Sequence, residues 1–223
     1  MENDMKLKEE IEKLKPMSFK QRLGYIRDYY KWPLIGAVFA LLLITGLAVS
    51  ISGSRKETVL TCTWVNETKA VTDVEKVAEG FSSYFEVNAK KQRLLFDNGT
   101  YIEPGSKDSY TIASQSRLSV MWQEGDLDIL IADEALTGEL AQNGWFSDLE
   151  SILPEDLFQA LSPYLLSFVG EDGASHIYGI DTSFSSINPM EDGSVPGAHV
   201  LCIPTTSRRL HAVFSFLNYI FGL

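Results

Sequence analysis

Twenty-three consecutive residues, from Trp32 to Ser54, carry no charge, and this stretch constrains the fold more than any other feature of the sequence. Built as a helix, its central part would be about 29 Å long, close to the roughly 30 Å hydrocarbon thickness of a bilayer. We therefore predict a transmembrane helix over residues 32–54. A cleaved signal peptide is the alternative, because Ala48-Val49-Ser50 has the small residues of a cleavage site. The thirty-one residues before the stretch and its length both favour an anchor.

The charges on either side of this stretch predict how the chain is placed. Residues 1–31 hold eight Lys and Arg against six acidic residues, whereas residues 54–223 hold eleven against twenty-four. By the positive-inside rule, residues 1–31 would be a cytoplasmic juxtamembrane segment and residues 55–223 an extracytoplasmic domain of a single-pass protein of the cell membrane. Within residues 18–30, a capping box and apolar residues at helical spacing predict an amphipathic helix, which either lies in the lipid headgroups or is merely solvated. The lipid bilayer would be bound through Trp32–Ser54.

The acidic balance of residues 54–223 limits the partners of this domain. An excess of thirteen negative charges does not favour binding to nucleic acid, which requires cationic side chains to displace counterions. The two cysteines, Cys62 and Cys202, both fall in this domain, where a disulfide would persist. Each lies in a short apolar run, so either the two form a disulfide between neighbouring strands or they are two buried free thiols.

Apolar periodicity and turn residues predict strands alternating with helices. The predicted strands cover residues 57–65, 92–96, 128–132, 176–180 and 198–203. Residues 97–100 are predicted as a hairpin turn and residues 182–197 as a loop, whereas residues 164–169 are either strand or helix. The helices cover residues 74–85, 109–124 and 134–143, one that begins at Pro154, and one that follows Pro204-Thr205-Thr206. The fold class that we predict is therefore α/β: one N-terminal transmembrane helix followed by a three-layer α/β domain with a mostly parallel sheet.

Polar residues follow the predicted strands where ligands usually collect in parallel sheets, at the carboxyl ends. The candidate ligand-binding residues are Trp64 and Asn66 after the first strand, Asp133 and Glu134 after the central strand, and Asp181 after a later one. Trp64 would stack on a ligand, and the carboxylates would accept hydrogen bonds. The alternative is that Asp133 only caps the following helix and that Trp64 belongs to the core.

Two stretches of the chain resemble extracellular solute-binding proteins of bacterial transporters. They are GDLDILIADE with the following ALTGELAQNGWFSDLESIL (residues 125–153), and IPTTSRRLHAVFSFLNYIFG (residues 203–222). The resemblance implies a domain like one lobe of such a protein, because the chain between Thr182 and Val200 is too short for the second lobe that family members have. The leader SFKQRLGYIRDYYKWPLI resembles those of small, uncharacterised single-pass proteins of Gram-positive anaerobes. A transporter permease would then be a partner.

Catalytic and metal-binding motifs are absent from the sequence. The three histidines have no metal-ligand spacing, and no nucleophile elbow, phosphate loop or paired cysteine motif is present. We expect no metal and no cofactor. Our leading hypothesis is a non-enzymatic binding or interaction module, and the alternative is an accessory or scaffold subunit of a membrane complex without a small-molecule ligand. A hydrolase that uses Cys62 or Cys202 with His199 is a distant third.

Overall fold

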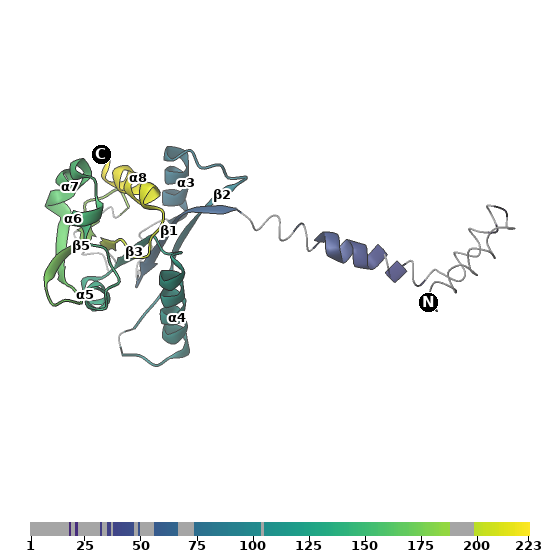
Figure 1. The fold of residues 1–223 in the computed structure, drawn as a ribbon, viewed down its shortest axis with the longest axis horizontal. Coiled ribbons are helices and arrows are strands. Elements are labelled where there is room, and N and C mark those ends of the chain that lie inside the picture. Colours follow the sequence, from purple (N-terminus) through teal and green to yellow (C-terminus); the bar gives the residue numbers. More distant parts are fainter. Residues whose placement is uncertain are drawn as a thin grey trace, which may run out of the picture. The chain divides into compact units, whose positions relative to one another are not determined.

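The computed structural model of the 223-residue chain describes residues 56–66, 74–103, 105–187 and 199–223, together with scattered residues between 18 and 49. The chain divides into two compact units, Met1–Arg55 and Lys56–Leu223, which are drawn in Figure 1 and are considered separately below.

In the first unit, the described part of the apolar stretch is helical, namely Trp32, Ile35, Gly36, residues 38–46 and Val49. Among the parts of the chain that the structure describes, no helix combines the length and the apolar character needed to cross a membrane. This finding contradicts the transmembrane helix that our predicted fold class includes. The rest of residues 32–54 lies outside the described residues, and so does the predicted amphipathic helix of residues 18–30, apart from Ser18 and Gln21. The orientation and the extracytoplasmic location remain predictions.

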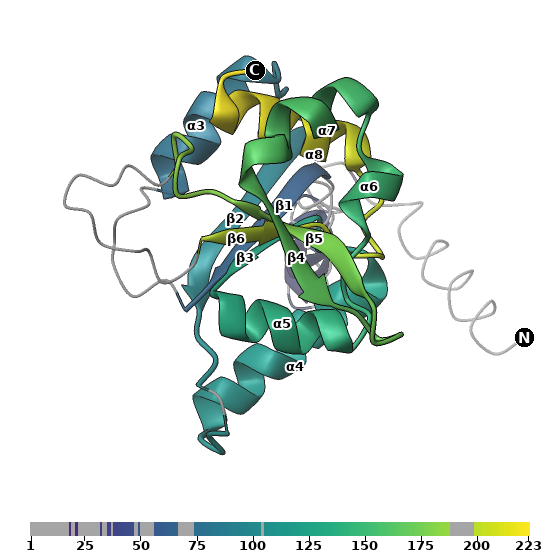
Figure 2. The ribbon, with the colours of Figure 1, turned by 90° about the vertical axis from the view of Figure 1, so that its left-hand side faces the viewer.

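The second unit is built on a six-stranded sheet, which Figure 2 shows between one group of helices above it and another below it. The strands follow in the order β2 (Gln92–Thr100), β1 (Glu57–Val65), β3 (Ile129–Ala132), β6 (Val200–Cys202), β5 (Ser175–Asp181) and β4 (Leu165–Val169). β1 pairs in parallel with β2 and with β3. The other three pairs are antiparallel: β3 with β6, β6 with β5, and β5 with β4. The predicted mostly parallel sheet is thus wrong, and the sheet is mixed.

A short connection explains the antiparallel pairing of β4 with β5. A parallel pair needs a crossover of a dozen or more residues, whereas an antiparallel pair can be joined by a tight turn. The turn between β4 and β5 closes with a hydrogen bond from Gly170 N–H to the Ala174 carbonyl (2.8 Å). β5 ends and β6 begins at the same edge, where Asp181 pairs with Val200. The sequence between them, Ser-, Pro- and Gly-rich, carries no predicted helix that would cross the sheet.

Helices cover both faces of the sheet and give the domain three layers (Figure 2). On one face lie α3 (Val74–Tyr84), α6 (Leu149–Ile152), α7 (Glu155–Leu161), the 3₁₀ turn η1 (Ser162–Tyr164) and α8 (Leu210–Phe221). Their apolar sides bury a core in which Phe81 meets Phe216 edge to face, with ring centroids 5.2 Å apart. On the other face lie α4 (Ser109–Glu124) and α5 (Glu134–Gln142), over a second core that includes Leu118 and Leu130.

Two local predictions differ from the structure. Residues 97–100 were predicted as a hairpin turn, but β2 continues through them to Thr100. The register against β1 shifts at this point, so a bulge absorbs the Asp-Asn-Gly sequence. The Asp97 side chain accepts hydrogen bonds there from Gly99 N–H (3.2 Å) and the Thr100 hydroxyl (3.0 Å). The last helix begins at Leu210 rather than directly after Pro204-Thr205-Thr206.

Candidate functional site

The carboxyl ends of β1, β3 and β5 meet at one edge of the sheet, which we call the strand-end edge. β1 and β3 are parallel, and β3 and β5 are both antiparallel to β6. The residue before β6, His199, joins two of these ends: its N–H donates to the Ala132 carbonyl (3.1 Å), and its carbonyl accepts from Thr182 N–H (2.8 Å). The strand-end edge consists of Asn66, Asp133, Glu134, Asp181 and His199. Four of these five are predicted ligand-binding residues, whereas His199 was predicted only as the partner of a cysteine in a hydrolase.

Asn66 and Asp133 hold the strand-end edge together. Asn66 has a left-handed backbone (φ 60°), which asparagine tolerates better than most residues. Its side-chain oxygen accepts from Ile102 N–H (2.8 Å), and its Nδ2 donates to Asp133 Oδ2 (3.3 Å). The other oxygen of Asp133 accepts from Leu136 N–H (2.8 Å) and caps α5. The side-chain oxygens of both residues are thus engaged in fixing the ends of β1 and β3.

Glu134 and Asp181 are the acidic groups of the edge that take no part in the Asn66–Asp133 hydrogen bond. The Glu134 side chain is 68% exposed, and its Oε1 lies 3.5 Å from His199 Nε2. Asp181 is half-buried and accepts from Ser183 N–H (2.9 Å) through one oxygen. Both groups can accept further hydrogen bonds from a ligand, so the edge presents acceptors beside one imidazole.

Trp64 does not belong to the strand-end edge. Its side chain has no exposed surface and packs edge-on against Phe96, with ring centroids 5.9 Å apart. Successive residues of a strand point to opposite faces, and in β1 Cys62 and Trp64 point into the core under α3 and α8. The predicted stacking of Trp64 on a ligand therefore has no place in this structure, and the alternative, a core residue, describes it.

The two cysteines are buried free thiols, not a disulfide. β3 lies between their strands: Cys62 is opposite Ile129, and Cys202 is opposite Leu130. Because Ile129 and Leu130 are neighbours in a strand, the two thiols point to opposite faces of the sheet, into separate cores. Burial raises the pKa of both thiols, so neither is poised as a nucleophile.

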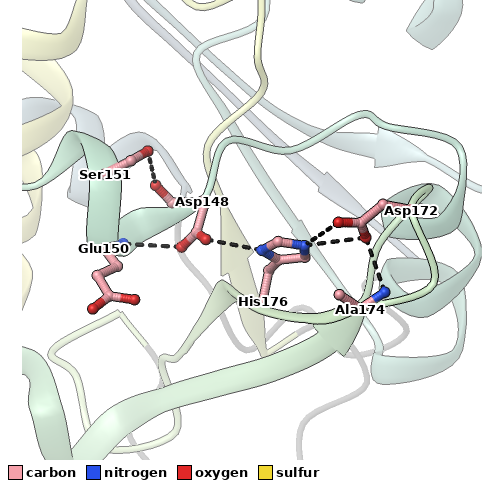
Figure 3. A network of polar contacts seen from close by, with 6 residues as sticks. All are labelled: Asp148, Glu150, Ser151, Asp172, Ala174 and His176. Atoms are coloured by element: carbon pink, nitrogen blue, oxygen red, sulfur yellow. Dashed lines mark hydrogen bonds and ion pairs between the residues drawn. The ribbon is translucent and has the colours of Figure 1, made fainter.

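A second polar cluster surrounds His176, away from the predicted site (Figure 3). Its Nδ1 lies 3.0 Å from Asp148 Oδ2, and its Nε2 lies 3.0 Å from Asp172 Oδ2. The hydrogen bonds to Asp172 and Asp148 raise the pKa of His176, and the Ala174 N–H and the imidazole lower the pKa of Asp172. Asp148 also accepts from Glu150 N–H (3.1 Å) at the start of α6. Both ring nitrogens are occupied, so the cluster ties the β4–β5 turn to α6.

At the opposite end of β3, a buried ion pair was also missed by the sequence analysis. The Asp128 carboxylate is fully buried and accepts from Thr61 N–H (2.8 Å), the Ser207 hydroxyl (2.9 Å) and Arg209 Nη1 (2.5 Å). Arg209 also reaches the exposed Asp126 (3.2 Å). These contacts join residues up to 81 positions apart, and the only hint in the sequence is an Asp at the head of an apolar run.

The described residues contain no group of three or more His, Cys, Asp or Glu side chains arranged to hold a metal ion. The strand-end edge can therefore be described as a surface of hydrogen-bond acceptors built on a fixed scaffold. The His176 cluster and the Asp128–Arg209 pair are bridges between segments that lie far apart in the sequence.

Comparisons with known proteins found little similarity. No protein-family model matches the chain, and no curated protein matches its sequence. A solved structure of an extracellular solute-binding protein family 1 from Alicyclobacillus acidocaldarius subsp. acidocaldarius is similar at 19% identity and a TM-score of 0.31. The match covers 57% of this chain and 28% of that chain. It is a protein of the kind that residues 125–153 and 203–222 resemble, but at this TM-score the likeness carries no argument about function.

Proposed function

We propose that the domain of residues 56–223 is a non-enzymatic binding module that holds a small polar ligand at the strand-end edge. One observation carries this proposal: the ends of β1 and β3 are joined by the Asn66–Asp133 hydrogen bond (3.3 Å) and those of β3 and β5 by the backbone of His199, while Glu134 beside them is exposed. A site whose scaffold is fixed before binding loses less entropy when a ligand arrives. The ligand class that fits such acceptors carries several donors, as sugars, amino acids and peptides do.

The residues of the edge have different roles in this proposal. Asn66 and Asp133 position the strand ends, because their side-chain oxygens already accept backbone hydrogen bonds. Glu134 and Asp181 contact the ligand. His199 lies 3.5 Å from Glu134 and orients its carboxylate. Substitutions at Glu134 and Asp181 therefore test binding with little effect on folding.

A thermal-shift screen of the purified full-length protein with sugars, amino acids and short peptides tests the proposal. A ligand present at 100 times its Kd stabilises by about 2.7 kcal/mol, which raises Tm by roughly 5–10 °C for a domain of this size. The Glu134→Gln/Asp181→Asn variant should keep its unliganded Tm and lose most of the shift. Glu139→Gln, an exposed carboxylate on the same helix, is the matched control. No shift with any compound, or equal shifts in all variants, would contradict the proposal.

An accessory or scaffold subunit without a small-molecule ligand is the second candidate, and an exposed aromatic group favours it. Phe184 is 72% exposed and lies against Tyr164, which stacks on Phe221 (centroids 5.9 and 5.1 Å apart). Aromatic side chains are enriched where proteins meet. A membrane protein such as a transporter permease is the partner that we propose for this candidate. If it is right, Phe184→Ser should abolish co-purification of the partner, while the ligand screen gives no shift.

A further inference from the structure

The strand β2 ends the sheet on one side and offers a free edge. Among the described strands it pairs only with β1, so one side of its backbone has no strand partner there. Near its end, Gly99 N–H donates to Asp97 and the Gly99 carbonyl accepts from the Tyr110 hydroxyl, so the free part of the edge precedes Gly99. Its side chains alternate between half-buried (Gln92, Leu94, Phe96) and more exposed (Arg93, Leu95) over its first five residues. Free strand edges are templates for the addition of another strand. The other edge strand, β4, has only five residues.

A hollow of about 540 Å³ runs beside the first half of β2. Its wall on the helix side is formed by α3 residues that include Ala78 and Ser82, and its wall on the sheet side includes Gln92, Arg93 and Leu94. Figure 1 shows α3 beside β2. Side chains of a strand added to β2 would alternate in direction, and those pointing toward α3 would enter this hollow.

Cations gather at this corner of an otherwise acidic domain. Of the nine Lys and Arg among the described residues of the 56–223 unit, four lie here: Lys56, Lys90, Lys91 and Arg93. The backbone brings Lys56 beside Lys91, because Glu57 N–H donates to the Lys91 carbonyl (2.9 Å). All four are exposed. Three acidic residues, Glu57, Glu79 and Glu86, lie among the four cations, so the corner carries a net charge of +1. Residues 54–223 as a whole carry eleven cations against twenty-four acidic residues. An acidic segment is attracted here and repelled elsewhere.

We propose that the free edge of β2 and the adjoining hollow bind an extended acidic segment of a partner protein, which adds to the sheet as a seventh strand. Backbone hydrogen bonds to β2 supply the affinity, small apolar side chains enter the hollow, and carboxylates on the segment meet the four cations. This surface is at the amino ends of β1 and β2, whereas the strand-end edge is at their carboxyl ends. The inference therefore stands apart from the proposed ligand site.

Fluorescence anisotropy with a labelled peptide of alternating Glu and Val tests this inference on the full-length protein. The Glu-Val peptide should bind, and a Lys-Val peptide of the same length should not. Lys90→Glu/Lys91→Glu should weaken binding by about tenfold, since two attractive exposed pairs become repulsive. The control Lys107→Glu/Arg208→Glu makes the same change in net charge at exposed sites away from β2 and should leave the affinity unchanged. Equal affinities for the Glu-Val and Lys-Val peptides, or equal weakening by the two variants, would overturn the inference.

Two N-methylated peptides distinguish strand addition from charge attraction alone. A strand uses alternate N–H groups to pair with its neighbour, so methylation of one alternate set should abolish binding and methylation of the other set should not. Equal affinities of the two methylated peptides, high or low, would refute strand addition. A dimer of the full-length chain that Lys90→Glu/Lys91→Glu dissociates, detected by light scattering, would also refute the proposal, by assigning the edge to a second copy. The Glu134→Gln/Asp181→Asn variant should bind the peptide normally, so this test and that of the ligand site can fail separately.

Discussion

Replacement of Arg209 by Met should destabilise the 56–223 domain by about 3–5 kcal/mol, because it leaves the Asp128 charge buried without its cation. The magnitude follows from burial: the Asp128 carboxylate has no exposed surface, and its other donors, Thr61 N–H and the Ser207 hydroxyl, are neutral. The second contact of Arg209, with Asp126, adds little, since that carboxylate is 68% exposed. Methionine keeps the apolar stem of the arginine side chain, so the lost packing is small.

The assay is urea denaturation of the full-length protein followed by tryptophan fluorescence, with free energies of unfolding from linear extrapolation. The double variant Asp128→Asn/Arg209→Met removes both charges and should recover a large part of the loss, since burial of a neutral amide costs less than burial of a lone carboxylate. Arg208→Met, at the exposed neighbouring position, is the control and should change the free energy by no more than about 0.5 kcal/mol. A loss below about 1 kcal/mol for Arg209→Met would refute the reasoning, because the pair would then behave as an exposed one.

Three further predictions concern the remaining polar contacts and the cysteines. His176→Gln should lower Tm most at pH 5–6 and least at pH 9. The pKa of His176 is raised in the folded protein, so its contribution to stability is complete below the unfolded pKa of about 6.5 and is lost as pH rises through the folded pKa. The pKa of its partner Asp172 is lowered, so that carboxylate loses its contribution only in acid. Calorimetry across this pH range, with the exposed His211→Gln as control, checks it, and a Tm difference that grows toward pH 9 would contradict it. Asn66→Ala should lower the free energy of unfolding, measured by urea denaturation, by about 2 kcal/mol, because alanine loses the hydrogen bond to Ile102 and is strained at φ 60°. An unchanged denaturation midpoint would show that the contact is dispensable. Cys62 and Cys202 should react with a thiol reagent only after unfolding, and the mass of the intact protein should be the same with and without reductant; a two-dalton difference would reveal a disulfide.

Local chemistry made some elements predictable from the sequence. The apolar run after Gly125 predicted a central strand, and β3 lies between β1 and β6. Gly125 itself ends α4 with a left-handed backbone (φ 69°), as a glycine after a helix often does. Asp133, weighed in advance as a helix cap, does cap α5. In each case the physical cause lies within a few residues of the signal.

Contacts between distant segments could not be predicted in the same way. The Asp148–His176 contact joins residues 28 positions apart, and nothing near either residue in the sequence indicates the other. The Asp128–Arg209 contact depends on how β3 and the segment before α8 come together at one end of the sheet. Trp64 shows the same limit on a smaller scale. Its position near the end of β1 was predictable, but the burial of its side chain depends on which helices cover that face of the sheet.

The direction of β6, which the predicted mostly parallel sheet has wrong, decides which residues lie at the strand-end edge. In a parallel sheet, the carboxyl end of β6 would lie at the strand-end edge, and His199, which precedes β6, would lie at the far end of the sheet. Because β6 is antiparallel to β3 and β5, its amino end lies between theirs, and His199 comes to 3.5 Å from Glu134. The rule that parallel strand ends collect ligands brings Asn66, Asp133 and Asp181 to one edge, but only the antiparallel strand adds an imidazole to it.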